Sequence, residues 1–314
     1  MNAAKTLLCA HDAGGANILA AWARMHPDPE SLLAVLDGPA KAIFARIAPS
    51  VAPAEFHDLE TLAPARDMVL CATSWACNLE RRVLARAGDL GLHRAAFLDH
   101  WLNYRTRFDA SATWPQSLPE EIWVGDSYAL DIARTEGFPE QRLRLVPNPY
   151  HALLRDEFTR MAAAPHDGTH LLYLSEIVAA HALKVHGSAD AWGYTEQGQM
   201  RGFLDALPTL AGTVSRVRVR LHPAEALDAY DGLLASRDMV IPVEVSQGGN
   251  LLEDLVWCDA AVGMESEALA VALDVARKPA VSCLPTGARA CRLPHEGIAR
   301  ICDFKQLAHH LQRG

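Results

Sequence analysis

Short apolar runs alternate with stretches of helical periodicity along most of the chain. Runs such as Lys5–Ala10, Met68–Ala72 and His170–Leu174 are typical of strands that are buried on both faces of a parallel sheet. Turns rich in Gly and Ser follow them. Apolar residues at spacings of three and four come next, as in amphipathic helices. This repeated order of strand, loop and helix predicts an α/β fold built on doubly wound parallel sheets.

The same pattern predicts where each element lies. Strands are expected at Lys5–Ala10, Leu32–Leu36, near Phe56, and at Met68–Ala72, Arg94–Leu98, Glu121–Val124, Leu143–Val146, His170–Leu174, Val217–Leu221, Met239–Val243, Asp259–Val262 and Lys278–Cys283. Helices are expected at Ile18–Met25, Ala40–Ile47, Leu79–Ala87, Tyr128–Glu136, Leu153–Ala163, Met200–Leu210, Ala224–Ala235, Asn250–Val256, Glu267–Ala276 and Phe304–Gln312. The segment Ala179–Gly193 is expected to be a long loop or a broken helix, either a lid or a merely mobile stretch.

Two prolines flank Asn148 in the segment Pro147–Tyr150, which can neither remain helical nor pair well as a strand. A chain of 314 residues favours two domains. We therefore expect an N-terminal Rossmann-like domain over residues 1–149 and a C-terminal Rossmann-like domain over residues 150–314, facing each other across a cleft.

A basic strand is expected to supply the main binding residues of the second half. Val217, Val219 and Leu221 alternate with Arg218 and Arg220, and Pro223 then ends the pairing because it has no N–H to donate. Ligands of open α/β sheets bind at the carboxyl ends of the strands. Arg220 and His222 are therefore candidates to bind an anionic ligand, the alternatives being a surface salt bridge and a hydrogen-bonded turn.

A second segment offers a complementary anion site. Asp259–Val262 reads as a strand, Gly263 as a turn, and Ser266 and Glu267 as the polar start of a helix. Such a start presents free backbone N–H groups and a partial positive charge, which suit phosphate. Ser266 is also an ordinary candidate for a helix cap. Ser175 and Glu176, at the end of another expected strand, are further candidates for nucleotide binding.

The first half carries its candidates in the loop His11–Asn17. Gly14 and Gly15 permit a tight turn or a close approach to a ligand. His11 and Asp12 follow an expected strand directly, so both are candidates for acid/base work on an acceptor hydroxyl. The alternative for Asp12 is a capping role at the following helix. Thr73 and Ser74, at another junction from strand to helix, are expected to line the same cleft.

The run Asp99–Phe108 is dense in functional side chains. Its rings and hydrogen-bonding groups suit sugar faces and hydroxyls, and its arginines suit carboxylate or phosphate. The alternative is a packed loop with a solvated basic end. We expect the run to bind sugar or acceptor, with His100 as a candidate base; the binding candidates are Asp99, Trp101, Asn103, Tyr104 and Arg105.

Composition narrows the classes of function. The formal charge of −9 and the pI near 5.8 argue against a general nucleic-acid binder. No stretch approaches the roughly 20 apolar residues of a membrane span, and Met1–Cys9 does not resemble a signal peptide. Seven scattered cysteines without a Cys-x-x-Cys pair predict reduced thiols in a cytoplasmic protein. We expect no metal site and no bound cofactor, because no ligand spacing for a metal occurs.

Two segments resemble the GT-B class of nucleotide-sugar enzymes. Arg220-Leu221-His222-Pro223 is similar to the His-Pro motif of bacterial sialyltransferases and related transferases of CMP-activated nonulosonic acids and Kdo. Gly263 to Val281 is similar to the family's loop, helix and strand, with Arg277 where Gly is usual. The likeness covers mainly residues 215–285, while Asp99–Phe108 and His11–Asn17 are similar to proteins of surface-polysaccharide gene clusters. The acidic triplet of those sialyltransferases is absent, so the Asp12 loop would replace it.

The resemblance implies a metal-independent glycosyltransferase with a GT-B-like fold. Its donor would be a nucleotide sugar bound by the C-terminal domain, and its acceptor a glycan or glycolipid of surface polysaccharide. Arg220, His222 and Ser266 would hold the donor phosphate, and Glu267 would suit the ribose. Asp12 or His100 would take the acceptor proton. Such acceptors often sit at membranes, so a peripheral contact with the inner face of the membrane fits this reading.

Two other functions stay open. A UDP-sugar 2-epimerase or hydrolase on the same fold would use acid/base carboxylates, for which Asp12, Asp99, Glu176 and Glu196 are available. A non-catalytic protein that binds nucleotide sugars would need none of them. The sequence names neither the sugar nor the acceptor, and it leaves the oligomeric state unknown.

Overall fold

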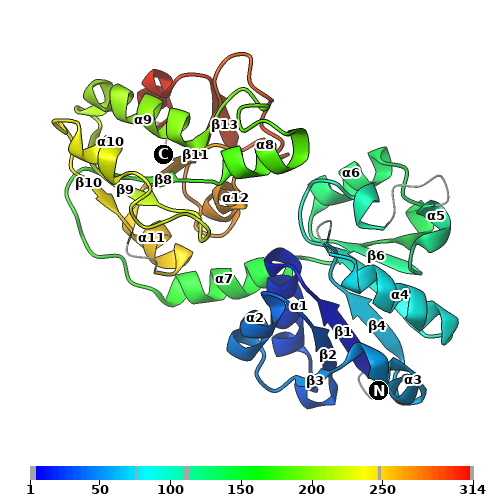
Figure 1. Cartoon of the computed structure of the whole chain (residues 1–314). Helices are drawn as coiled ribbons and strands as arrows, with labels where there is room; N and C mark the ends of the chain where they lie inside the picture. Colours follow the sequence, from blue (N-terminus) through cyan, green and yellow to red (C-terminus); the bar gives the residue numbers. More distant parts are fainter. Residues whose placement is uncertain (1–4, 75–76, 109–113, 247–248, 312–314) are drawn as a thin grey trace. The chain divides into compact units, whose positions relative to one another are not determined.

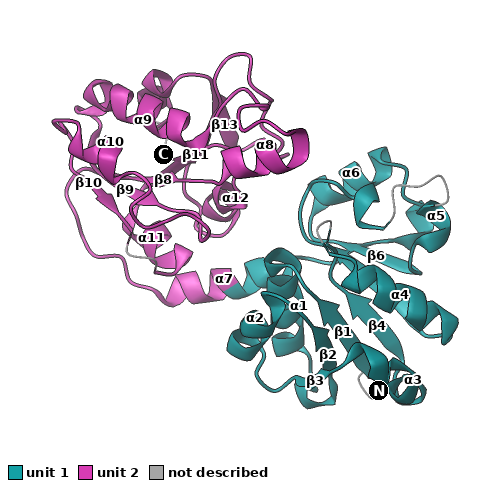
Figure 2. Cartoon of the chain, in the orientation of Figure 1, with its two compact units in different colours: residues 1–153 teal, residues 154–314 magenta. Residues whose placement is uncertain are grey.

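The computed structural model describes residues 5–74, 77–108, 114–246 and 249–311. The chain divides into two compact units, residues 1–153 and 154–314 (Figure 2). The division falls within helix α7 (Pro149–Arg160), and the boundary expected after residue 149 falls in the same helix. The expectation that Pro147–Tyr150 is not helical is wrong for its last two residues, because Pro149 opens α7, a position that proline favours. Among the described residues, no helix is both long and apolar enough to span a membrane.

Unit 1 contains a seven-stranded parallel sheet (Figure 1). Its strand order is β3-β2-β1-β4-β5-β6-β7. The strands are β1 (Thr6–Ala10), β2 (Leu33–Leu36), β3 (Ala52–Ala54), β4 (Met68–Cys71), β5 (His93–Leu98), β6 (Glu121–Val124) and β7 (Leu143–Leu145). The α-helices are α1 (Ala13–Met25), α2 (Ala40–Ile47), α3 (Leu59–Leu62), α4 (Leu79–Asp89), α5 (Trp114–Ser117) and α6 (Ser127–Thr135).

Unit 2 contains a six-stranded parallel sheet with the order β10-β9-β8-β11-β12-β13. Its strands are β8 (Thr169–Leu174), β9 (Val214–Arg220), β10 (Val243–Val245), β11 (Ala260–Gly263), β12 (Ala280–Cys283) and β13 (Ile298–Ile301). Its α-helices, apart from α7, are α8 (Val178–His186), α9 (Glu196–Leu210), α10 (Asp231–Ala235), α11 (Leu251–Trp257), α12 (Glu267–Asp274) and α13 (Leu307–Leu311).

Each sheet has a point at which the strand order reverses. In unit 1 this point lies between β1 and β4, and in unit 2 between β8 and β11. The helices that follow the two strands of such a pair lie on opposite faces of the sheet, so their connecting loops diverge and leave a crevice at the carboxyl edge. Each unit therefore has one topologically defined position for a ligand.

Each unit also has its own apolar core. In unit 1, Leu8 and Ala10 of β1 and Phe97 of β5 are buried with Leu19 of α1 and Phe44 of α2. In unit 2, the alternating residues Val217 and Val219 of β9 are fully buried, whereas the intervening arginines are partly exposed. The alternation predicted for the basic strand is thus confirmed, and it places Arg220 at the carboxyl edge of the sheet.

The α/β architecture and most of the expected elements are confirmed, but several details are wrong. The expected helix Ala224–Ala235 forms only over Asp231–Ala235, because turns precede it and Glu225 bonds back to the backbone N–H of His222. The strand expected at Met239–Val243 is displaced to Val243–Val245. The strand expected near Phe56 lies at Ala52–Ala54, and β13 was not expected. The segment Ala179–Gly193 contains most of helix α8, which ends before Gly187, so the alternative of a broken helix is confirmed there.

Candidate functional site

Arg220 ends β9 and forms an ion pair with α11. Its Nη1 lies 2.6 Å from Oδ2 of Asp254 and 2.9 Å from the carbonyl oxygen of Gly249. Asp254 is buried and also pairs with Arg218 from the same strand. Arg218 also pairs with Glu244 at 2.6 Å, so two carboxylates balance the two guanidinium groups and the positive charge of Arg220 is already compensated within the protein.

His222 follows β9 and is held in a defined orientation. Its backbone N–H donates to Oε2 of Glu225 at 2.7 Å, and its Nδ1 accepts the N–H of Ala224 at 3.1 Å. Burial lowers the pKa of the imidazole, and His181 of α8 lowers it further. In the neutral ring, the proton then belongs on Nε2 because Nδ1 acts as an acceptor. Nε2 can donate this proton to a phosphate oxygen.

Ser175, at the end of β8, takes part in an internal network. Its hydroxyl lies 2.8 Å from Oε1 of Glu225 and 2.6 Å from the hydroxyl of Tyr230, which also donates to Glu225. Ser175 and Tyr230 are both buried. Ser175 therefore braces the carboxylate that orients His222, and its hydroxyl is turned into the protein.

The turn between β11 and α12 presents the start of a helix at the reversal point of unit 2. Ser266 is the N-cap of α12, and its hydroxyl oxygen accepts the N–H of Ala268 at 3.2 Å. Glu267, half-buried, opens the helix. Gly263 is required for close packing, because a Cβ there would lie 2.9 Å from the carbonyl oxygen of Leu174 in β8. The ends of β8 and β11 thus lie side by side.

Glu176 reaches across this reversal point. Its Oε1 accepts the backbone N–H of Glu265 at 2.6 Å. Burial raises the pKa of its carboxyl to about 7, although backbone N–H groups of Glu265, Ser266 and Met264 partly offset that effect. The carboxylate of Glu176 therefore lies at the start of α12, where the sequence predicted a phosphate.

Two arginines that the sequence did not single out lie beside the same turn. Arg289 and Arg292 both pair with Glu265, the second with Nη2 2.7 Å from Oε1. The guanidinium of Arg289 also stacks on Trp192, 3.7 Å from the ring centroid. The sequence signal was two arginines within four residues just after an expected strand, in a segment for which no element was expected.

In unit 1, His11 and Asp12 form a hydrogen-bonded pair at the reversal point. Nδ1 of His11 lies 2.7 Å from Oδ1 of Asp12, and the hydroxyl of Ser74 donates to Oδ2 of Asp12 at 2.6 Å. Asp12 occupies the N-cap position of α1, but its side chain makes no capping bond. The expectation that Ser74 lies with these residues is confirmed. The side chains of His11 and Asp12 are each about one quarter exposed.

Glu80 of α4, which was not among the residues predicted from the sequence, supports this pair. Its Oε1 accepts the backbone N–H of His11 at 2.8 Å, and its side chain is buried. Burial raises the pKa of the Glu80 carboxyl. A signal was present, because Glu80 lies three and four residues before the buried Val83 and Leu84, on the apolar face of the helix.

The first part of the run Asp99–Phe108 is folded into unit 1. Asp99 pairs with the buried Arg107, which also donates to the hydroxyl of Thr73 at 2.9 Å. Nδ1 of His100 accepts the backbone N–H of Trp101 at 2.9 Å. The ring of Trp101 is buried, and its indole N–H donates to Asp126 at 2.9 Å. These contacts hold the loop against the sheet.

The second part of the run has mixed exposure. Tyr104 is fully buried and packs edge-on against Phe138. Asn103 is exposed, with a φ of +59° that non-glycine residues seldom adopt. Arg105 is exposed, and its guanidinium lies over the ring of Trp114 at 4.6 Å. Asn103 and Arg105 therefore face solvent, whereas Tyr104 belongs to the core.

Gly14 and Gly15 let α1 pack closely. A Cβ on Gly14 would lie 2.5 Å from Oδ2 of Asp99, and a Cβ on Gly15 would lie 2.5 Å from Cβ of Ala72. Both glycines thus have a packing role at the reversal point. Gly38 has a related role, because a Cβ there would lie 2.8 Å from Nε2 of His11.

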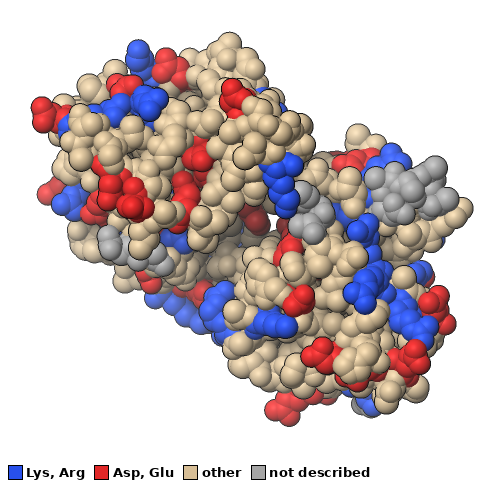
Figure 3. All heavy atoms as spheres, in the orientation of Figure 1, with Lys and Arg blue, Asp and Glu red and all other residues tan. Residues whose placement is uncertain are grey.

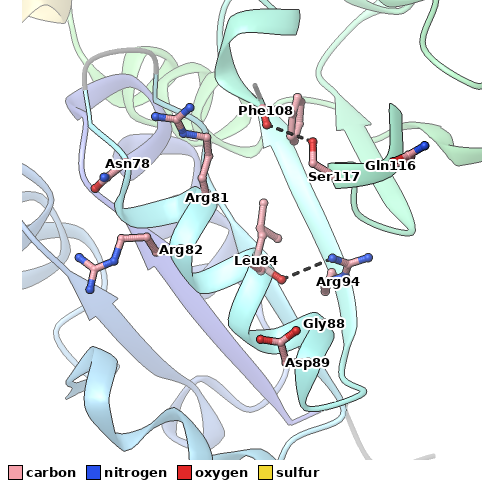
Figure 4. Close-up of a pocket in the computed structure, with 11 residues that line it drawn as sticks. Asn78, Arg81, Arg82, Leu84, Gly88, Asp89, Arg94, Phe108, Gln116 and Ser117 are labelled. Carbon is pink, nitrogen blue, oxygen red and sulfur yellow. Dashed lines mark hydrogen bonds between the residues drawn. The ribbon is translucent and has the colours of Figure 1, made fainter. Parts of the chain in front are cut away.

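A cavity of about 650 Å³ lies elsewhere in unit 1, beside α4 (Figure 4). Its lining includes Arg81, Arg82 and Arg94, and none of the predicted site residues. The guanidinium of Arg94 is paired with Glu120. Over the described ranges, no cluster of three or more His, Cys, Asp or Glu residues could hold a metal ion. On the face shown in Figure 3, acidic and basic side chains occur in small groups on both units.

Comparison with known proteins yields structural likeness only. No protein-family model matches the chain, and no curated protein matches its sequence. A protein of Listeria monocytogenes, provisionally assigned as a UDP-N-acetylglucosamine 2-epimerase, has a TM-score of 0.68 at 12% identity, covering 100% of this chain and 89% of that one. Anabaena Alr3699/HepE, in complex with UDP-glucose, has a TM-score of 0.59 at 12% identity, covering 98% and 89%.

Acinetobacter baumannii MurG has a TM-score of 0.55 at 11% identity, covering 98% of this chain and 92% of that one. Identities this low establish the fold alone. The chain thus has the two Rossmann-like domains that the sequence predicted, and its structural neighbours include both glycosyltransferases and UDP-sugar epimerases.

Proposed function

We propose that this chain is a glycosyltransferase that moves a sugar from a nucleotide donor to a hydroxyl of a glycan or glycolipid acceptor, without a metal ion. The observation that carries the proposal is the pairing of His11 with Asp12 at the reversal point of unit 1. A carboxylate there could simply have capped α1, but it binds an imidazole and a hydroxyl instead. This is the arrangement of an oriented general base.

On the acceptor side, Asp12 determines which nitrogen of His11 is free. In the neutral imidazole, the Nδ1–H of His11 would donate to the carboxylate of Asp12, which leaves Nε2 free to accept the proton of the attacking hydroxyl. The carboxylate then stabilises the imidazolium that forms. The missing side chain at Gly38 leaves room beside Nε2. Asp12 is therefore the orienting residue and His11 the base, with His100 as the alternative base from the sequence.

On the donor side, unit 2 supplies charge for the leaving nucleotide. His222 presents a neutral N–H donor, and the backbone N–H groups before α12 carry the partial positive charge of a helix start. Ser266, whose oxygen already accepts a backbone N–H, retains its own O–H to donate. Together these groups stabilise growing negative charge on phosphate. Glu267, the first residue of α12, would accept ribose hydroxyls.

The identity of the donor nucleotide is the first property to determine. The Arg-x-His-Pro motif favours a CMP-activated nonulosonic acid or Kdo, whereas one structural neighbour was solved with UDP-glucose. Thermal shift with CMP, UDP, dTDP and GDP separates them, since a ligand that binds the folded state raises the melting temperature. Product analysis with the matching sugar donors, with and without a saccharide acceptor, then identifies the reaction.

Variants of the two units should separate chemistry from binding. His11→Ala and Asp12→Asn should each reduce transfer by about 10²- to 10⁴-fold, the usual contribution of a general base, with nucleotide affinity unchanged. His222→Ala should weaken nucleotide binding. Equal affinity in the wild type and His222→Ala would exclude the donor assignment.

Product analysis also distinguishes the alternatives. Sugar turnover that needs no acceptor and inverts a ring carbon would identify an epimerase, the activity named for two structural neighbours. Nucleotide binding without any turnover would identify a binding protein. Transfer that persists in both His11→Ala and Asp12→Asn would refute the base assignment.

A further inference from the structure

The crevice at the reversal point of unit 2 is occupied by a side chain of the protein itself. Ligands of open α/β sheets bind at this point, between the carboxyl ends of β8 and β11. Glu176 extends from the end of β8 and accepts the N–H of Glu265 just before α12. A carboxylate oxygen and a phosphate oxygen both accept such N–H groups, so the two groups compete for the same donors.

A buried tyrosine also lies near the turn between β11 and α12. Tyr194 is 94% buried, since its exposed fraction is 6%, and its hydroxyl has no hydrogen bond of ordinary geometry to any described residue. Glu265, Glu176 and Arg289 are its electrostatic neighbours, and its contact with the side chain of Arg289 falls outside the geometry of an ordinary hydrogen bond. A buried hydroxyl without a partner usually costs free energy unless a ligand completes its bonding. This hydroxyl therefore points to a ligand position at the same turn.

The local charges also depend on Glu176. Arg289 and Arg292 together carry two positive charges, and Glu265 balances one of them. The ionised carboxylate of Glu176 adds a further negative charge at this turn, beside Glu265. With Glu176 withdrawn, the turn would lose one negative charge and regain free backbone N–H groups beside Arg289 and Arg292, which favours an anion.

We propose that Glu176 is a displaceable internal anion that keeps the place of the donor phosphate until a nucleotide binds. The phosphate accepts the N–H groups before α12, and the carboxylate of Glu176 moves out of the crevice to water. This inference rests on the proposed function, because it assumes that a nucleotide is the ligand of unit 2. In the protein without a nucleotide, the carboxylate of Glu176 would occupy the phosphate position.

The electrostatics of the contact make displacement feasible. Burial raises the pKa of Glu176 to about 7, so the ionised carboxylate is held there against a desolvation cost. Its release to water recovers that cost. The incoming phosphate recovers the N–H bonds that the carboxylate gives up.

The affinity of UDP for variants of residue 176 tests this directly by titration calorimetry on the full chain. Glu176→Gln keeps the size of the side chain and its acceptor oxygen but removes the charge. Glu176→Ala also removes the acceptor. We expect UDP to bind about 5- to 50-fold more tightly to both variants than to the wild type. Equal or weaker binding to both variants would overturn the inference, because a residue that contacts the nucleotide would lose affinity on removal.

Asp259→Asn is the matched control. Asp259 accepts the N–H of His170 at 2.8 Å, a similar bond between a carboxylate and the backbone, but at the amino edge of the same sheet. It should leave UDP affinity unchanged, and a gain there equal to that of Glu176→Gln would overturn the inference as a general charge effect. If neither the wild type nor any variant binds UDP, CMP, dTDP or GDP, the proposed function itself fails. Wild-type binding without a gain at residue 176 leaves that function standing and removes only the displacement.

Discussion

Glu176 and Asp12 occupy comparable positions, just after β8 in unit 2 and just after β1 in unit 1. Both carboxylates bond across a reversal point to groups that follow the neighbouring strand, Glu176 to the N–H of Glu265 and Asp12 to the hydroxyl of Ser74. Glu176 is linked to α12, whereas Asp12 orients an imidazole. At the scale of residues, the same position in the topology therefore serves two roles. In unit 2 it holds the carboxylate of Glu176 against the start of α12, and in unit 1 it holds the carboxylate of Asp12 in a candidate catalytic pair.

The raised pKa of Glu176 predicts a pH dependence of stability. Its value is about 7 in the folded chain and near 4.5 in the unfolded chain, so the folded state binds more protons between these values. This group therefore destabilises the fold as pH rises from 4.5 to 7, and its effect is constant above that window. The relative stability of Glu176→Gln should rise by about 1 to 3 kcal/mol between pH 5 and pH 8.

Urea unfolding of both proteins at several pH values measures this difference, and taking the difference cancels the titration of other carboxylates. A difference that does not change with pH would show that Glu176 has an ordinary pKa. Glu265, Tyr194 and Tyr173 surround it; burial raises the pKa values of both tyrosines, which keeps them neutral across this range.

The candidate residues at the strand ends could be predicted from sequence, because parallel strands align their carboxyl ends. The partners of those residues could not. Glu176 and Glu265 are 89 positions apart, and their contact requires that β8 and β11 be neighbours. The burial of Tyr104 and Trp101 could not be predicted either, because an aromatic residue in a loop is equally compatible with binding a sugar and with packing in the core.

At the scale of elements, the turns between helices and strands decide the local geometry. Arg277 illustrates this, because it follows α12 with a φ of +57°, where glycine is favoured. The resemblance had identified this position as one usually held by Gly. The residues Ala224–Tyr230 have good helical propensity but form turns instead of a helix. There the carboxylate of Glu225 accepts hydrogen bonds from the backbone N–H of His222 and the hydroxyl of Tyr230.

Replacement of two helical glycines by alanine should change the stability of the fold in opposite directions. Gly14→Ala in α1 would place a Cβ 2.5 Å from Asp99, whose ion pair with the buried Arg107 leaves it little freedom to move. We expect a loss of about 1 to 3 kcal/mol, typical of overpacking. Gly202→Ala in α9 meets nothing closer than 3.8 Å and should gain about 0.5 to 1 kcal/mol through helix propensity. Thermal unfolding compares the two, and equal signs would contradict the packing role of Gly14.

At the scale of the whole molecule, the candidate groups divide between the two units. His11, Asp12 and Ser74 belong to unit 1, and the candidate phosphate ligands belong to unit 2. The doubly wound parallel architecture could be anticipated from the alternation of elements, whereas the strand order could not, because right-handed crossovers only limit the possible orders. Strand β13 could not be predicted from the sequence, because its four residues include Arg300 and form no long apolar run.

Unit 2 expressed alone, as residues 154–314, should fold and bind nucleotide. It has its own sheet and core, and it contains the predicted nucleotide-binding residues. We expect a cooperative thermal transition and a UDP affinity within about threefold of that of the full chain, without transfer activity. A folded fragment that fails to bind UDP when the full chain binds it would mean that unit 1 supplies essential contacts.

The filled crevice of unit 2 has a practical consequence for inhibitor discovery. Virtual screening that ranks empty volume would be drawn to the cavity beside α4, which contains no residue predicted to act in catalysis (Figure 4). Fragments that carry a carboxylate, tetrazole or phosphonate would instead compete with Glu176 for the backbone N–H of Glu265. An acidic fragment library tested on Glu176→Ala is therefore the more productive starting point for medicinal chemistry on this fold.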